Sequence, residues 1–172
     1  MPEEKSEVWQ RGPLKDIPEL LQPVAHALLQ AREELKDLTD NFPESLLWER
    51  PAGVASPAFH IQHLTGVLER LFTYAKSKPL SPAQLYNLSI EGDQLNTSLN
   101  LANLVQLFNE QVDVSIYQLS REDITLLTDV RTIGRKQIPT TLIGLYIHAA
   151  EHTMRHIGQL HVTIKILEGV NS

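Results

Sequence analysis

The chain has 172 residues, the size of one domain, and its 15 Lys and Arg against 21 Asp and Glu give a net charge of −6. This acidic balance argues against general electrostatic binding to nucleic acid, because such binding needs a basic surface. The absence of cysteine excludes disulfide bonds, thiolate metal sites and a cysteine nucleophile.

The first half of the chain predicts two long helices separated by a loop. Apolar residues recur at three- and four-residue steps from Pro18 to about Leu38, which indicates an amphipathic helix. Proline and glycine then mark a loop from Asp40 to Ser56. Ser56-Pro57 is a typical helix start, with the serine as N-cap and the proline at the first helical position. The second helix is expected to continue to about Lys76.

The second half predicts two more long helices with irregular segments before each. Residues 80–95 are expected to hold one short helix, and the third long helix fits Thr97 to about Leu119. Between Arg121 and Gln137, β-branched residues and a glycine favour an irregular segment with a short hairpin. The last helix is expected to begin near Pro139-Thr140 and to end at about Leu167, with Gly169 as its C-cap.

Four long helices joined by loops of moderate length predict an all-α fold, a four-helix bundle with the hairpin segment before the last helix. We expect residues 1–172 to form a single domain in which residues 1–14 are a flexible N-terminal segment. The N-terminus lacks the cationic start and apolar stretch of a signal peptide, and no run approaches the roughly 18 apolar residues of a membrane span. The expectation is therefore a cytoplasmic protein without a membrane partner.

Histidine spacing is the most informative part of the sequence. His60 and His63 lie on the second predicted helix, and His148, His152 and His156 lie on the last one. An i,i+4 step turns a helix by about 400°, so successive partners lie on one face. His152 with His156, or His148 with His152, can therefore bind one metal ion. His148 and His156 are about 12 Å apart along the helix axis, too far for all three histidines of this helix to bind one ion. A third ligand is therefore expected from His63 or His60 on the facing helix.

Three neutral imidazoles leave coordination positions open for water or substrate, which is typical of a reactive rather than a structural metal site. Imidazole suits zinc, nickel, copper and iron, and the sequence does not choose among them. Glu151 lies next to His152 but about 100° away around the helix, so we expect it to orient a neighbouring group. Gln159, three residues after His156, is a candidate hydrogen-bond partner of a ligand or water. Packing is the competing interpretation for that glutamine.

The motif His152-Thr-Met-Arg-His156-Ile-Gly-Gln159 resembles the histidine helix of the DinB/YfiT-like metalloenzymes. The loop from Trp48 to Ser56 and the segment from Phe59 to Leu64 resemble that family's loop and second-helix histidine. The resemblance implies a four-helix bundle, often a homodimer, with a divalent metal held by His63, His152 and His156. His60 and His148 then become neighbours of the site. Ile157 departs from the pattern, because many relatives have arginine there.

The resemblance also implies an activity. Characterised relatives include transferases that join a low-molecular-weight thiol to electrophiles, which makes thiol-dependent S-transferase chemistry on a small molecule the first hypothesis. The cofactor would be a divalent ion, zinc or nickel first, and the thiol a cosubstrate. A hydrolase that uses metal-bound water and a non-catalytic metal- or ligand-binding stress protein are the alternatives. The candidate catalytic residues are His60, His148, Glu151 and Gln159.

Overall fold

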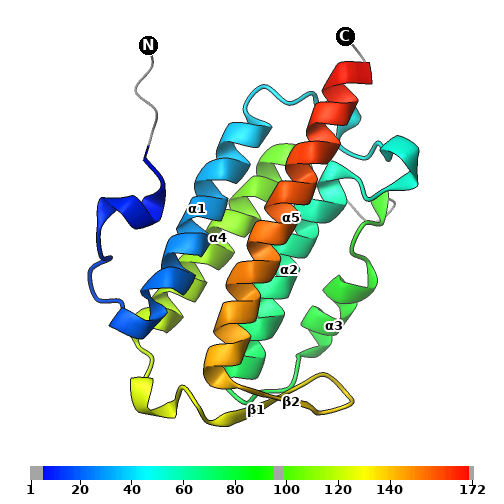
Figure 1. The fold of residues 1–172 in the computed structure, drawn as a ribbon. Helices are drawn as coiled ribbons and strands as arrows, with labels where there is room; N and C mark the ends of the chain where they lie inside the picture. The colour runs from blue at the N-terminus through cyan, green and yellow to red at the C-terminus, as the bar shows by residue number, and fades with distance from the viewer. Residues whose placement is uncertain (1–5, 95–98, 171–172) are drawn as a thin grey trace.

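Four long helices run alongside one another in the computed structural model, which describes residues 6–94 and 99–170 (Figure 1). They are α1 (Gln22–Thr39), α2 (Pro57–Ala75), α4 (Leu101–Ser120) and α5 (Leu142–Val170), and the short helix α3 (Pro82–Ser89) lies beside α2. Helices α1 and α2 each contact both α4 and α5, so the order around the bundle is α1, α5, α2, α4. The expected all-α four-helix bundle is confirmed.

The core of the bundle follows from the apolar periodicity of its helices. Leu28 and Leu35 on α1, Leu64 and Leu68 on α2, and Phe108 on α4 are all fully buried. Each such side chain contributes about 1.5–3 kcal/mol when it leaves water. Because this core extends along the bundle, it holds the backbones of α2 and α5 at a fixed separation, and these are the two helices that carry the histidines of interest.

Side-chain caps set where α2 and α4 begin. Ser56 Oγ accepts a hydrogen bond from the Phe59 backbone N–H at 3.2 Å, and α2 starts at Pro57 as predicted. The predicted start of the third long helix at Thr97 lies outside the described residues. Helix α4 begins at Leu101, directly after Asn100, whose side-chain oxygen accepts from the Asn103 N–H at 2.8 Å.

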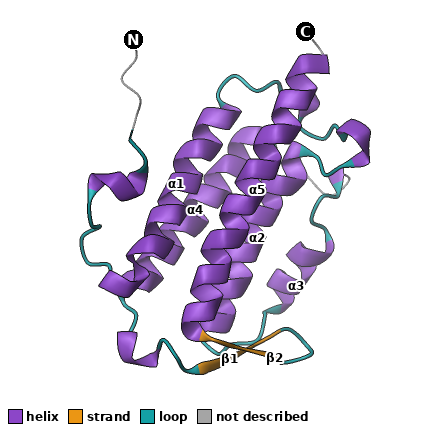
Figure 2. Cartoon of the chain, in the orientation of Figure 1, coloured by secondary structure: helices purple, strands orange, loops and turns teal. Residues whose placement is uncertain are grey.

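The predicted hairpin is present, and it moves the start of the last helix. Strands β1 (Val130–Ile133) and β2 (Ile138–Thr141) pair antiparallel at one end of the bundle (Figure 2). The expected helix start at Pro139-Thr140 is wrong, because both residues belong to β2. Helix α5 begins at Leu142, and Thr141 Oγ1 accepts from the Gly144 N–H at 3.1 Å. Gly169, expected as the C-cap, lies inside α5.

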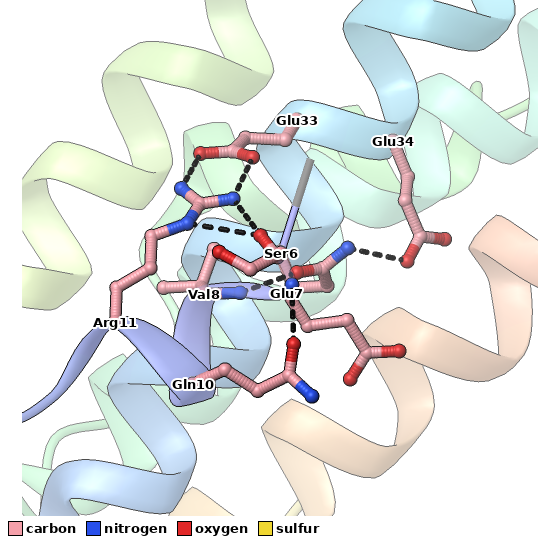
Figure 3. A network of polar contacts seen from close by, with 8 residues as sticks. Ser6, Glu7, Val8, Gln10, Arg11, Glu33 and Glu34 are labelled. Atoms are coloured by element: carbon pink, nitrogen blue, oxygen red, sulfur yellow. Dashed lines mark hydrogen bonds and ion pairs between the residues drawn. The ribbon is translucent and has the colours of Figure 1, made fainter. Parts of the chain in front are cut away.

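A short turn of 3-10 helix, Val8–Arg11, packs the N-terminal segment against α1 (Figure 3). The Arg11 guanidinium pairs with both carboxylate oxygens of Glu33, at 2.6 and 2.8 Å. The Val8 N–H donates to Gln30 Oε1 at 2.9 Å, and Gln30 in turn donates to Glu34 at 3.0 Å. These contacts attach residues 6–11 to the bundle.

The expected flexibility of residues 1–14 stays a prediction, and residues 1–5 of that segment lie outside the described part of the chain. Across the described residues, no helix combines the length and the apolar character that crossing a membrane requires.

Candidate metal centre

Three histidines from two helices meet between α2 and α5. His63 of α2 and His152 and His156 of α5 each offer one ring nitrogen, and these three atoms lie within 4.8 Å of one another. The ring centroid of His63 lies 4.4 Å from that of His156 and 5.2 Å from that of His152. The Nε2 atoms of His63 and His152 are 2.9 Å apart. Zinc binds imidazole nitrogen at about 2.0–2.1 Å, so a small adjustment of the rings lets one ion reach all three.

The environment favours the neutral form of the two imidazoles on α5, His152 and His156. Burial, followed by the nearby His63, lowers the pKa of His156 to about 4. Burial and the neighbouring His63 also lower the pKa of His152 below its ordinary value. A histidine must be deprotonated to bind a cation, so these rings are in the ligand form at neutral pH. The donor set therefore fits a divalent ion that accepts nitrogen ligands.

His63 is oriented by a carboxylate that the sequence did not indicate. Its Nδ1 lies 2.8 Å from Glu91 Oε2, and the other carboxylate oxygen of Glu91 accepts a hydrogen bond from Arg70. Burial raises the pKa of Glu91, but the hydrogen bonds with His63 and Arg70 outweigh it and leave that pKa below its usual value. The Phe59 ring stacks on the His63 ring, with centroids 5.4 Å apart. These contacts leave Nε2 of His63 directed at the other two histidines.

His156 is held by a second histidine, His60, which is only 4% exposed. The two Nδ1 atoms are 3.0 Å apart, so one of them donates and the other accepts. Burial and the nearby His63 lower the pKa of His60 to about 4. With His60 as the acceptor, His156 carries its proton on Nδ1, and its Nε2 is free to bind a cation.

His152 differs from the other two ligand candidates. Its Nδ1 is buried and has no hydrogen-bond partner among the described residues. Metal-binding histidines normally donate through their second ring nitrogen, which fixes the tautomer. His63 keeps its proton on Nδ1, where Glu91 accepts it, so the contact between the two Nε2 atoms requires His152 to carry its proton on Nε2. Of the three, His152 is the one that would adjust most when an ion binds.

One protein-family model matches most of the chain. The family model of the DinB superfamily matches residues 27–160, a segment that contains all three histidines. The chain belongs to the DinB superfamily. A search of curated proteins found no match.

In this DinB-superfamily protein, His148, Glu151 and His152 form a second group whose ligand atoms lie within 4.8 Å of one another. His148 and Glu151 are both about half exposed, with His148 Nδ1 3.6 Å from Glu151 Oε2. Glu151 Oε1 already accepts from Arg155, and all these residues come from one helix. We therefore favour the partly buried group of His63, His152 and His156, which is drawn from two helices. His148 and Glu151 lie at its exposed side.

A pocket of about 540 Å³ borders the centre at His60. Its lining is mainly apolar, from the loop before α2 and from α5, and its polar members besides His60 are Arg155, Gln159 and Thr163. Ile157, the position that departs from the family motif, is buried, and Arg155 is the cationic side chain that lines this pocket. Gly158 also lines the pocket, and an added Cβ would meet nothing within 4 Å.

Proposed function

We propose that the chain is a metal-dependent enzyme that acts on a small molecule, with a divalent ion, zinc or nickel first, bound by His63, His152 and His156. The first candidate reaction is the transfer of an electrophile to a low-molecular-weight thiol. The observation that carries the proposal is the convergence of three imidazole nitrogens from two helices within 4.8 Å. Family membership supports it, because the matched segment contains the whole set of ligands.

The chemistry supplied by a bound divalent ion would be a lowered pKa of a coordinated thiol, which is then available as thiolate at neutral pH. Three protein ligands leave a coordination position for such a cosubstrate. The chain has no cysteine, so the thiol must come from outside it. In the transfer, the sulfur forms a bond to the electrophilic carbon of the second substrate. The leaving group departs with the electron pair of the bond that breaks, and the thiol proton passes to solvent.

The pocket beside His60 is the proposed binding place of the electrophilic substrate. Val162 and Ile166 give it an apolar wall, and Arg155 and Gln159 can hold a polar or anionic group. With a pKa of about 4, His60 is a poor general base at neutral pH. Its contact with His156 supports a role in orienting that ligand instead.

The metal content of the purified protein tests the proposed site. Protein prepared without chelator is expected to carry about one equivalent of divalent metal per chain. Replacement of His63, His152 or His156 by alanine should each abolish this content, whereas His148→Ala should weaken binding less. If His148→Ala empties the site while His156→Ala leaves it full, the exposed group is the metal site and the proposed ligand set is wrong.

Turnover separates the reaction classes. A panel of electrophiles is incubated with several low-molecular-weight thiols, and the thioether product is measured with and without added metal. Metal-dependent product that is lost in His156→Ala supports the transferase. Hydrolysis of esters or amides in the absence of thiol would instead indicate a hydrolase. Metal-loaded protein that forms no product with any substrate would indicate a binding protein.

The family resemblance also leads us to propose a homodimer that works in the cytoplasm. Light scattering coupled to gel filtration tests the dimer, since it distinguishes one from two copies of a 19.4 kDa chain.

A further inference from the structure

We propose that Glu91 is a positioning residue of the metal centre, which fixes the His63 ring so that its Nε2 faces the bound cation. The inference rests on the metal site proposed above. It assigns a role to a residue that lies outside both histidine helices, in the segment after α3.

The contacts of Glu91 account for both of its carboxylate oxygens. Oε2 lies 2.8 Å from His63 Nδ1, and Oε1 accepts from Arg70. The side chains of Glu91 and Arg70 are 9% and 10% exposed, and that of His63 is 18% exposed. Carboxylates that accept from the outer nitrogen of a metal-binding histidine fix its tautomer and raise its basicity as a ligand. Glu91 has the geometry for that role.

An ionised carboxylate can only accept hydrogen bonds, and this restricts the protonation of His63. The His63 proton must lie on Nδ1, where Glu91 accepts it, and the lone pair of Nε2 then faces His152 and His156. Arg70 holds the second oxygen, so the carboxylate cannot rotate away without leaving a buried guanidinium unpaired. A buried cation without its partner is costly, which keeps Glu91 in place.

Two glycines make room for this arrangement. A Cβ on Gly66, which lies within α2, would collide with both Glu91 Oε1 and Arg70 Nη1. Glycine destabilises a helix interior by about 1 kcal/mol relative to alanine. The space that Glu91 and Arg70 need explains why a glycine lies at position 66 nevertheless. Gly92, directly after Glu91, has a φ of +81°, and its N–H donates to Gln62 Oε1 at 2.7 Å. Gly66 therefore leaves space for the side chains of Glu91 and Arg70, and the hydrogen bond of Gly92 attaches the backbone next to Glu91 to α2.

The first test is Glu91→Gln, measured by competition between the protein and a chelator for Zn²⁺. An amide has one oxygen, so it cannot place an acceptor both at the Oε2 position that faces His63 and at the Oε1 position that faces Arg70. When that oxygen faces Arg70, the amide NH₂ faces His63 Nδ1 and favours the tautomer with hydrogen on Nε2, which cannot bind metal. We expect about a 10- to 100-fold loss of Zn²⁺ affinity. The visible absorption of the Co²⁺-loaded protein should change as well, because the geometry around the ion changes.

The matched control is Glu69→Gln. Glu69 lies on the same helix as His63 and lines the same pocket as Glu91, but its carboxylate makes no hydrogen bond to a histidine among the described residues. This variant removes the same charge from the same region, and it should keep wild-type Zn²⁺ affinity and the wild-type Co²⁺ spectrum.

Gly66→Ala provides a test that changes neither a ligand nor Glu91 itself. The added methyl group should displace the pair of Glu91 and Arg70 and lower Zn²⁺ affinity in the same direction as Glu91→Gln, although alanine favours the helix more than glycine does. If Glu91→Gln does not fold because Arg70 has lost its anionic partner, the double variant Arg70→Met with Glu91→Leu removes that charge and leaves His63 Nδ1 without an acceptor. It should show the same loss of affinity.

The outcomes distinguish this inference from the proposed function. Wild-type protein that binds no Zn²⁺ would overturn the metal centre and with it the role of Glu91. Wild-type protein that binds Zn²⁺ while Glu91→Gln and the double variant bind it equally well would overturn the inference alone. A loss of affinity in Glu69→Gln equal to that in Glu91→Gln would also overturn it, because the effect would then be one of general charge.

Discussion

The pair of His60 and His156 shows what burial does to two imidazoles in contact. Both have a pKa lowered to about 4, mainly by burial and further by the nearby His63. The ordinary pKa of histidine is about 6.5, so between pH 6.5 and 4 the unfolded chain binds more protons than the folded one. The stability due to their neutral forms is present above pH 6.5 and is lost as the pH falls toward 4.

This predicts that the metal-free protein becomes less stable to urea as the pH drops from 7 to 4.5. The His60→Gln variant lacks one of the two titrating rings, so its free energy of unfolding should depend less steeply on pH. His161→Gln, at an exposed position of α5, should keep the wild-type slope. Equal slopes for wild type and His60→Gln would contradict the prediction.

At the scale of whole elements, the start of α2 matters for the site. His60 and His63 lie in the first two turns of this helix, so the Ser56 cap that fixes its start also fixes the position of both rings. The cap of α4 at Asn100 has similar geometry, but α4 carries none of the site histidines. Removing either cap should destabilise the fold to a similar extent, but only removal of the Ser56 cap should disturb the histidines.

We expect Ser56→Ala and Asn100→Ala each to lower the free energy of unfolding by about 1 kcal/mol, because each removes a side-chain acceptor of a helix N-terminus. Only Ser56→Ala should also weaken Zn²⁺ binding, since it loosens the turn that contains His60. Urea denaturation measures the first effect and chelator competition the second. Equal Zn²⁺ affinities in the two variants would show that the start of α2 does not control the site.

Comparison of the predicted with the observed elements shows what local sequence determines. The four long helices were predictable because their apolar residues recur with the period of a helix and because Ser56-Pro57 is a local start signal. The start of α5 was not, since Pro139 joins β2 through pairing with Thr132, a contact that helix periodicity does not describe. Sequence could not place Glu91 either, because its contact with His63 depends on how the segment after α3 returns to α2.

The histidine cluster itself was anticipated in part. The i,i+4 spacing places His152 and His156 on one face of α5, and this follows from helix geometry alone. The choice between His60 and His63 as the third member needed the family resemblance. In the structure His63 joins the cluster, whereas His60 forms a hydrogen bond with His156 through the Nδ1 atoms of the two rings. Whether these three residues bind metal stays a prediction, as does the role of each catalytic candidate.

At the scale of the whole molecule, the proposed centre connects only one pair of helices. Its three ligands come from α2 and α5, which are neighbours in the bundle, and the other two long helices contribute apolar packing. A cation bound there would therefore act as a crosslink between two elements far apart in the sequence. Binding to the folded state alone must raise the stability of the entire bundle, because the helices share one core.

This predicts a thermal shift that depends on the ligands. Zn²⁺ at 100 times its dissociation constant should stabilise the fold by about 2.7 kcal/mol. For a chain of this size, that corresponds to a rise in Tm of roughly 5–10 °C over the chelator-treated protein. His156→Ala should show no rise, because the ion loses one of its three anchors, while His148→Ala should keep most of it. A rise of equal size in His156→Ala would mean that Zn²⁺ stabilises the bundle from some other position, and the crosslink between α2 and α5 would have to be abandoned.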